Sequence, residues 1–172
     1  TQAIMEAACE LTAAGVKVIP EIEVPLVGLA NEIKILREVC EKVAKEIIER
    51  TGTNVPYTIG TMIELPRACV AADQIAEHAD FMSFGTNDLT QTTFGFSRDD
   101  SGKFLEEYVD RHLMPQDPFV SIDENGVGKL MQLAVELGRK TKSGLEIGIC
   151  GEHGGDPQSV VFCHNIGLDF VS

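Results

Sequence analysis

YTIGTMIELPRACVAADQIAEHADFMSFGTND, residues 57–88, is the stretch of sequence that decides the fold. Its opening run, Tyr57–Ile63, is mostly apolar and contains β-branched side chains, which predicts a strand. Pro66 then opens a predicted helix that runs to about His78, because proline favours the first turn of a helix. A second apolar run, Phe81–Phe84, predicts another strand. A strand, a helix and a strand in this order indicate two parallel strands joined by a covering helix.

The same alternation continues on both sides of this stretch. Upstream we expect a helix, a strand and an amphipathic helix, at residues 2–14, 16–27 and 31–50. Downstream, the polar residues 86–100 predict a long functional loop. Beyond it we expect a marginal helix at 103–113, a clear helix at 127–139 and a strand at 145–149. A helix capped by Asp156 follows at 156–165, and a last strand at 168–171. The sequence therefore predicts one α/β domain with five parallel strands over residues 1–172.

Composition argues against several classes of protein. Apolar residues make up 44% and charged residues 24% of the 172 residues, which is typical of soluble globular domains. No apolar run approaches the roughly 20 residues that span a bilayer, and the first residues do not resemble a signal peptide. The net charge of -13 argues against a nucleic-acid partner, and an anionic substrate would need a local cation or a well-placed arginine. The five cysteines show no CxxC spacing, so we predict neither a zinc site nor a disulfide framework and expect a reducing cytosol.

Polar, reactive side chains follow three of the predicted strands. Glu64 follows the first strand of the opening stretch, Gly85-Thr86-Asn87-Asp88 follow the second, and Cys150 follows the strand at 145–149. In parallel α/β folds the site lies at the carboxyl ends of the strands, and neighbouring strands are about 4.8 Å apart. We therefore expect Glu64, Asp88 and Cys150 to converge on one pocket. The alternative is that the two carboxylates are ordinary helix caps.

The predicted acidic pair suits a magnesium ion. Mg²⁺ is typically held by one or two carboxylates, with substrate oxygens and waters completing an octahedron. Glu64 and Asp88 supply two such carboxylates if their strand ends are neighbours. The ion would also provide the positive charge that an anionic substrate needs in so acidic a chain.

Two longer motifs resemble a known family. The runs Gly60–Ala68 and Ser83–Gln91 are similar to signatures of the enzymes that use phosphoenolpyruvate (PEP). Within that family, Thr92–Asp100 and Cys150–Asp156 resemble the pyruvate, phosphate dikinase branch. The resemblance covers essentially the whole chain and implies a (β/α)₈ barrel, of which residues 1–172 would be about the last five strands. The first barrel strands, a phosphohistidine domain and a nucleotide-binding domain would lie outside these residues.

The resemblance also implies an activity and roles for individual residues. The activity is that of a Mg²⁺-dependent phosphotransferase, which moves a phosphoryl group between a phosphohistidine and pyruvate. The overall reaction converts ATP, phosphate and pyruvate to AMP, pyrophosphate and PEP. The resemblance implies that Glu64 and Asp88 bind magnesium, and that Asn87 and the amides of Gly85 and Thr86 bind substrate oxygens. It implies that Arg98 binds the phosphoryl group. Cys150 would protonate carbon 3 of the pyruvate enolate.

The chemistry of Arg98, and that of His153 in the motif Cys150–Asp156, leaves alternatives open. Arg98 lies in an acidic segment, and a lone arginine there is more often a surface ion pair. His153 is interpreted as a hydrogen-bonding support of the site, with a purely structural histidine as the alternative. The acid role suits Cys150, because an ordinary thiol has a pKa of about 8.5 and is protonated at neutral pH.

The expected partners are pyruvate or PEP and the phosphohistidine domain of the parent enzyme. A five-strand arc exposes two sheet edges, so we also expect self-association, as a homodimer formed through this domain. We expect neither nucleic acid nor membrane as a partner, and a cytoplasmic location, or a plastid in a plant. The alternatives are a PEP synthase and a truncated, non-catalytic barrel that serves as an oligomerisation module. Binding of Mg²⁺ discriminates the enzyme from the scaffold.

Overall fold

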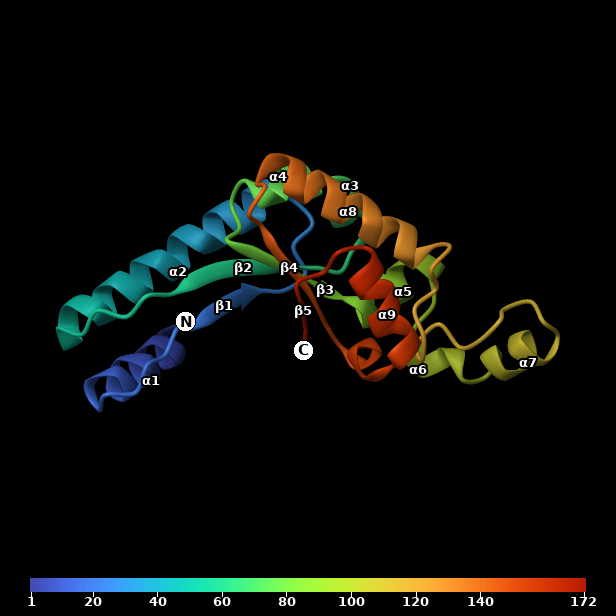
Figure 1. Cartoon of the computed structure of the whole chain (residues 1–172), viewed down its shortest axis with the longest axis horizontal. Helices are drawn as coiled ribbons and strands as arrows, with labels where there is room; N and C mark the ends of the chain where they lie inside the picture. Colours follow the sequence, from blue (N-terminus) through green and yellow to red (C-terminus); the bar gives the residue numbers. More distant parts are fainter.

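Five parallel strands form a single sheet in which each strand pairs with the next one in the chain (Figure 1). The computed structural model describes all residues 1–172. The strands are β1 Glu21–Val24, β2 Thr58–Ile63, β3 Phe81–Gly85, β4 Glu146–Cys150 and β5 Phe170–Val171. The order β1-β2-β3-β4-β5 leaves β1 and β5 at the two edges. This arrangement confirms the α/β class and the five predicted strands, and it is that of a partial (β/α)₈ barrel.

Helices connect the strands and cover one side of the sheet. Figure 1 shows α2, α3, α4 and α8 along that side. The helices are α1 Gln2–Ala13, α2 Ala30–Thr51, α3 Pro66–Val70, α4 Ala72–Ala76, α5 Thr86–Phe94, α6 Arg98–Ser101, α7 Leu105–Asp110, α8 Val127–Thr141, the 3₁₀ helix η1 Glu152–Gly155 and α9 Pro157–Asn165. No helix is both long and apolar enough to cross a membrane.

The two faces of the sheet differ in chemistry because side chains alternate along each strand. The side chains facing the helices are apolar and fully buried, among them Ile59, Ile63, Met82, Phe84, Ile147 and Ile149. Glu23 and Ser83 occupy the alternate positions and hydrogen-bond to each other across the other face. The core therefore lies between sheet and helices, and the opposite face is free to carry polar groups.

The predicted loop at 86–100 is wrong, because most of it is helical. Gly85 caps α5, which ends at Gly95 in the left-handed conformation with φ of 72°. The Ser97 side chain then caps α6 by accepting a hydrogen bond from the Asp99 amide. The segment read as a loop because its side chains are polar. The structure shows that this polarity belongs to a helix start at the end of a strand.

Two smaller predictions also differ from the structure. Residues 16–19 are not part of a strand; Val16 and Ile19 are 48% and 53% exposed, and pairing with β2 begins only at Glu21. Pro20 has no amide to donate, which is consistent with the strand starting after it. The single helix expected from Pro66 is two short helices that meet at Ala71, and no glycine or proline in the sequence explains this break.

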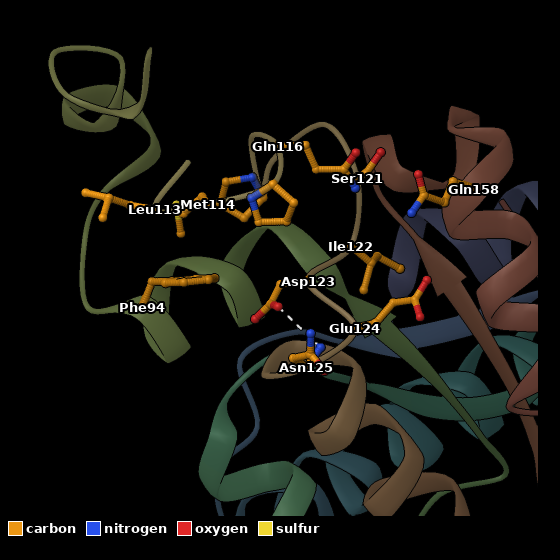
Figure 2. Close-up of a pocket in the computed structure, with 12 residues that line it drawn as sticks. Phe94, Leu113, Met114, Gln116, Ser121, Ile122, Asp123, Glu124, Asn125 and Gln158 are labelled. Atoms are coloured by element: carbon orange, nitrogen blue, oxygen red, sulfur yellow. Dashed lines mark hydrogen bonds between the residues drawn. The ribbon is translucent and has the colours of Figure 1, made fainter. Parts of the chain in front are cut away.

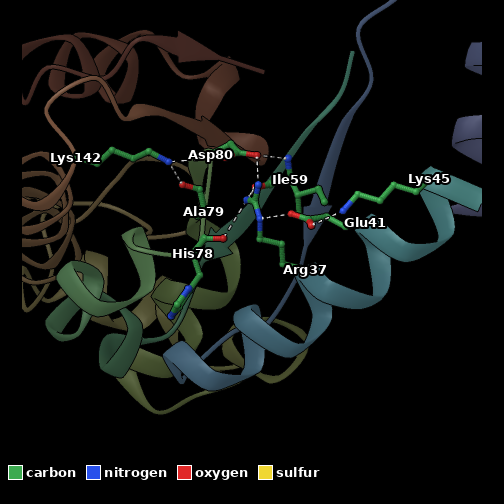
Figure 3. Close-up of polar contacts among 8 residues, drawn as sticks. All are labelled: Arg37, Glu41, Lys45, Ile59, His78, Ala79, Asp80 and Lys142. Carbon is green, nitrogen blue, oxygen red and sulfur yellow. Dashed lines mark hydrogen bonds and ion pairs between the residues drawn. The ribbon is translucent and has the colours of Figure 1, made fainter. Parts of the chain in front are cut away.

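An arginine clamp closes the amino-terminal end of the sheet (Figure 3). Arg37 on α2 donates to the Asp80 carboxylate at 3.0 Å and to the carbonyl oxygens of Ile59 and His78, both at 3.2 Å. The same Asp80 oxygen accepts a hydrogen bond from the Ile59 amide at 2.9 Å. The clamp joins α2 to the starts of β2 and β3, at the end of the sheet opposite to the predicted site, where side chains usually serve stability.

Candidate active site

Three predicted site residues meet at the carboxyl end of the sheet. The register pairs Ile63 with Phe84 and Gly85 with Cys150. Glu64, one residue beyond Ile63, therefore lies beside Gly85, which lies beside Cys150. The contact between Glu64 and Gly85 is so close that a Cβ added to the glycine would overlap the Glu64 carboxylate. Glu64 and Cys150 thus follow strands that both pair with β3, as expected, and the convergence of Glu64, Asp88 and Cys150 on one pocket stays a prediction.

An acidic pair forms at this end of the sheet. Glu64 is 2% exposed, and the Leu26 amide donates to one of its carboxylate oxygens at 2.6 Å. Burial raises the pKa of Glu64, and the negative charges of Asp88 and Glu23 raise it further, while the Leu26 amide opposes both effects. Asp88 lies in the first turn of α5 and accepts a hydrogen bond from the Gln91 side chain at 3.0 Å.

This pair fits a divalent cation with few protein ligands. The charge of Asp88 raises the pKa of Glu64, and a positive ion placed between the two carboxylates would relieve their repulsion. The chain has no group of three or more His, Cys, Asp or Glu side chains arranged to hold a metal ion. An ion bound by Glu64 and Asp88 would therefore need substrate oxygens and waters, which is the usual condition of Mg²⁺.

The start of α5 supplies groups suited to an anion. Gly85 is the N-cap, and Thr86, Asn87 and Asp88 form the first turn of this nine-residue helix. The first amides of a helix have no acceptor within it, and the helix dipole favours negative charge there. The side-chain oxygen of Asn87 is buried without a partner in the chain. A ligand with both acceptor oxygens and an associated cation or water would satisfy these groups.

Cys150 is the one cysteine that is not fully buried. Its sulfur lies 3.3 Å from the Ser83 hydroxyl oxygen and 3.6 Å from the Phe84 carbonyl oxygen. Burial raises the pKa of the Cys150 thiol; the Ser83 hydrogen bond lowers it, and the carboxylates of Glu23 and Glu64 raise it further. The result is a thiol that stays protonated at neutral pH, as an acid catalyst requires.

His153 is buried between two segments and both of its ring nitrogens have partners. Nδ1 lies 2.7 Å from the Thr86 hydroxyl oxygen and Nε2 lies 2.9 Å from the Pro118 carbonyl oxygen. Because a carbonyl can only accept, Nε2 carries the proton and Nδ1 accepts from Thr86. Burial lowers the pKa of His153 although the Pro118 carbonyl opposes this, so the ring is neutral. These contacts support the interpretation of His153 as a hydrogen-bonding support of Thr86.

Arg98 lies at the start of α6 and forms an ion pair with Glu152 in η1. Its side chain is 41% exposed, and its backbone amide donates to the Gln91 side chain at 2.8 Å. Gln91 also donates to Asp88, so Arg98 is linked to the acidic pair through one side chain. The observed contact is the ion pair expected of a surface arginine, and the phosphoryl-binding role of Arg98 stays a prediction.

Sequence reasoning missed three polar residues at this end of the sheet. Ser83 contacts Cys150, Glu23 accepts the Ser83 hydrogen bond, and Gln91 joins Asp88 to Arg98. A signal was present for two of them: Ser83 interrupts the apolar run of β3, and Glu23 lies between the buried Ile22 and Val24.

A separate cavity lies away from these residues (Figure 2). Its volume is about 440 Å³, and none of the predicted site residues lines it. The walls come from the end of α5, the segment 113–125 and one side chain of α9, and include Phe94, Met114, Asp123 and Gln158. It has no pair of reactive groups comparable to the acidic pair and thiol, so we assign the candidate active site to the strand ends.

Comparison with known proteins gives a consistent result. Residues 1–172 match the profile of the PEP-utilising enzyme, PEP-binding domain family. The chain is similar to pyruvate, phosphate dikinases from Clostridium symbiosum (54% identical over 100% of this chain and 20% of the relative) and Rhizobium meliloti strain 1021 (59%, 99% and 19%). It is also similar to the chloroplastic pyruvate, phosphate dikinase 1 of Arabidopsis thaliana (54%, 99% and 18%). The chain thus spans about a fifth of the length of these relatives.

Proposed function

The chain belongs to the PEP-utilising enzymes, through their PEP-binding domain, and from this premise we propose that it forms the pyruvate and PEP side of the active site of a pyruvate, phosphate dikinase. The part of the reaction assigned to it is phosphoryl transfer between a phosphohistidine and pyruvate. The overall reaction would convert ATP, phosphate and pyruvate to AMP, pyrophosphate and PEP. The three relatives described above are named as this dikinase, which favours it over a PEP synthase.

One observation carries the proposal: Glu64, Gly85 and Cys150 occupy neighbouring strand ends, with Asp88 beside Glu64. This arrangement brings an acidic pair, helix amides and a protonated thiol together at the carboxyl end of the sheet. A small anionic substrate needs each of these: a cation held by the carboxylates, donors for its oxygens, and an acid for its carbon. An oligomerisation module would need none of them.

The chain's residues divide the work by their chemistry. Glu64 and Asp88 would hold Mg²⁺, which would supply Lewis-acid stabilisation of the negative charge that develops on the substrate. The amides of Gly85 and Thr86 and the side chain of Asn87 bind substrate oxygens at the start of α5. Arg98, once released from Glu152, binds the phosphoryl group.

Cys150 moves the proton at carbon 3. In the direction of pyruvate formation its thiol gives a proton to the enolate, and in the direction of PEP formation the thiolate takes that proton back. The contacts of Cys150 with Ser83 and the Phe84 carbonyl hold the sulfur at the strand end. A thiol with a raised pKa is a suitable acid because it does not ionise before the enolate forms.

The remaining parts of the enzyme are partners of this domain. The phosphohistidine domain would deliver the phosphoryl group to the carboxyl end of the sheet, and a nucleotide-binding domain would bind ATP. A homodimer formed through this domain would cover exposed apolar side chains such as Ile35 and Val39 on α2, which are 59% and 53% exposed. The location would be the cytoplasm, or a plastid in a plant, as in the chloroplastic relative.

The proton-transfer role is tested in the intact protein that carries this chain. Exchange of the C3 hydrogens of pyruvate with D₂O, followed by proton NMR, should be lost in Cys150→Ala. Cys40→Ala, which removes a buried thiol on α2 far from the strand ends, should exchange at the wild-type rate. Exchange that persists in Cys150→Ala would remove Cys150 from the acid role.

Magnesium binding separates the enzyme from the scaffold alternative. Titration with MgCl₂, followed by calorimetry, should show binding that Asp88→Asn weakens. Asp110→Asn, at the exposed end of α7, is the matched control and should bind Mg²⁺ like wild type. A wild-type protein that does not respond to Mg²⁺ would favour the oligomerisation module.

A further inference from the structure

We propose that Ser83 and Glu23 form a proton path from Cys150: Ser83 positions the thiol, and Glu23 stores the proton that the thiol exchanges with substrate. The inference rests on the proposed role of Cys150 as the acid and base at carbon 3. It adds two positioning residues that do not touch the substrate. Their side chains come from β1 and β3, on the same face of the sheet as Cys150 of β4.

The directions of the hydrogen bonds define the path. Ser83 has a single hydroxyl proton, and it donates this proton to the Glu23 carboxylate. The Ser83 oxygen can therefore only accept from Cys150, whose sulfur lies 3.3 Å away. When Glu23 is ionised, the thiol proton has two acceptors, the Ser83 oxygen at 3.3 Å and the more distant Phe84 carbonyl oxygen at 3.6 Å. These contacts hold the sulfur at the strand end.

Glu23 is suited to receive a proton because nothing else neutralises it. It lies half-buried between Ile22 and Val24, and Ser83 is its one hydrogen-bond partner. No lysine, arginine or histidine forms an ion pair with Glu23. In the arginine clamp at the opposite end of the sheet, by contrast, Glu41 and Asp80 are each paired with an arginine or a lysine. Burial raises the pKa of Glu23, with a smaller contribution from Glu21 and an opposing one from Ser83.

The proposed step conserves protons and electrons. To act as a base toward pyruvate, Cys150 must lose its thiol proton: this proton moves to the Ser83 oxygen as the Ser83 hydroxyl proton moves to Glu23. The thiolate is then stabilised by the Ser83 hydroxyl, which donates to sulfur, and Glu23 is a neutral carboxylic acid that donates to Ser83. The C3 proton of pyruvate next moves to the thiolate sulfur, which leaves the enolate. In the opposite direction the thiol protonates the enolate, and Glu23 returns a proton to sulfur through Ser83.

Two variants of the intact enzyme test the path. Ser83→Ala removes the relay, and Glu23→Gln keeps an acceptor for the Ser83 hydroxyl but cannot take a proton. Each should lower the rate of C3 hydrogen exchange of pyruvate about 10- to 100-fold, the scale on which loss of alignment affects a reacting group. The KM for pyruvate should stay unchanged, because neither residue touches substrate. If Glu23 served only to hold Ser83 in place, the exchange rate of Glu23→Gln would stay close to that of wild type.

Matched controls separate this effect from a general loss of structure. Ser121→Ala removes another buried serine that donates to a carboxylate, Asp156 at 2.8 Å, and Glu146→Gln neutralises an exposed glutamate at the start of β4. Both should exchange at the wild-type rate. A wild-type rate in Ser83→Ala or Glu23→Gln, with exchange lost in Cys150→Ala, would overturn the path and leave the proposed function intact. Exchange retained in Cys150→Ala would instead overturn the proposed function. If Ser83→Ala does not fold, Glu23→Gln alone decides.

Discussion

The Nδ1 atom of His153 lies 2.7 Å from the Thr86 hydroxyl oxygen, and this hydrogen bond joins the segment after β4 to the first turn of α5. The other ring nitrogen contacts the Pro118 carbonyl, so a third segment is fixed by the same ring. The start of α5, where we propose substrate binding, is therefore held by a neutral, fully buried side chain that need not touch substrate.

Removal of the His153 ring should destabilise the fold. His153→Ala leaves the Thr86 hydroxyl and the Pro118 carbonyl without partners in a buried position, so we expect a loss of about 2–4 kcal/mol in the free energy of unfolding. Urea unfolding followed by circular dichroism measures this loss. His164→Ala, at an exposed position on α9, is the control and should change stability by less than about 0.5 kcal/mol. Equal effects of the two substitutions would contradict the role of the ring.

The same histidine should make stability fall in mild acid. Burial lowers the pKa of His153 below its ordinary value of 6.5, so the unfolded chain takes up a proton first as pH falls. Stability is therefore complete above about pH 6.5 and is lost as pH falls toward the folded pKa, by at most about 1.4 kcal/mol per pH unit. Urea unfolding between about pH 7.5 and about pH 5.5 should show this slope in wild type and not in His153→Ala. Equal slopes in both would contradict it.

The arginine clamp should contribute to stability without affecting the site. Arg37→Met removes donors to Asp80 and to the carbonyls of Ile59 and His78, and we expect a loss of about 2 kcal/mol, reduced by partial exposure of the pair. Lys45→Met removes an exposed ion pair with Glu41 and should cost less than about 0.5 kcal/mol. Thermal unfolding measures both losses. A Lys45 effect as large as that of Arg37 would argue against the clamp.

Most of the fold could be predicted because local pattern and tertiary structure agree. The helix 31–50 has one apolar face, and the observed α2 extends it by one residue at each end. The predictions are wrong where the local sequence pattern and the tertiary structure disagree. Thr86–Phe94 is a helix with a polar first turn that faces the site, so its composition resembles a loop. Val16 and Ile19 are apolar yet exposed, so hydrophobicity alone placed a strand too early.

The site could be predicted only as far as strand order allows. Glu64 and Cys150 follow their strands directly, and parallel pairing alone brings such positions together. Ser83 and Glu23 could not be assigned, because their contact crosses from β1 to β3 over the intervening strand β2. Gly60, opposite Glu23 in the register, has no side chain, and the Phe81 ring packs against it. Each residue interrupts an apolar run, but their contact with each other requires coordinates, because no spacing in the sequence pairs β1 with β3.

Cys150 should be the first cysteine to react with iodoacetamide in the native protein. It is half-buried, whereas Cys9, Cys40, Cys69 and Cys163 are at most 9% exposed, and burial raises the pKa of Cys69 to about 12 and that of Cys163 to about 11. Peptide mass spectrometry after brief labelling identifies the modified residue. In urea all five cysteines should react, which controls for peptide detection. Faster labelling of any other cysteine in the native state would contradict the structure.

An alanine at Gly85 should disturb the proposed magnesium site through Glu64. Gly85 has a backbone φ of -82°, which alanine adopts without strain, so the effect of the substitution lies in the side chain. The added Cβ would overlap the Glu64 carboxylate and lie 2.9 Å from its Cβ, so the glutamate side chain must shift from its observed position. We expect Mg²⁺ affinity to fall about 10- to 100-fold, the scale of a disturbed ligand position, with an overpacking cost of about 1–3 kcal/mol in stability.

Gly102→Ala is the matched control, because a Cβ there meets no atom within 4 Å. Calorimetric titration with MgCl₂ measures the affinity of both variants. Wild-type affinity in a folded Gly85→Ala protein would mean that the position of Glu64 above Gly85 does not determine metal binding.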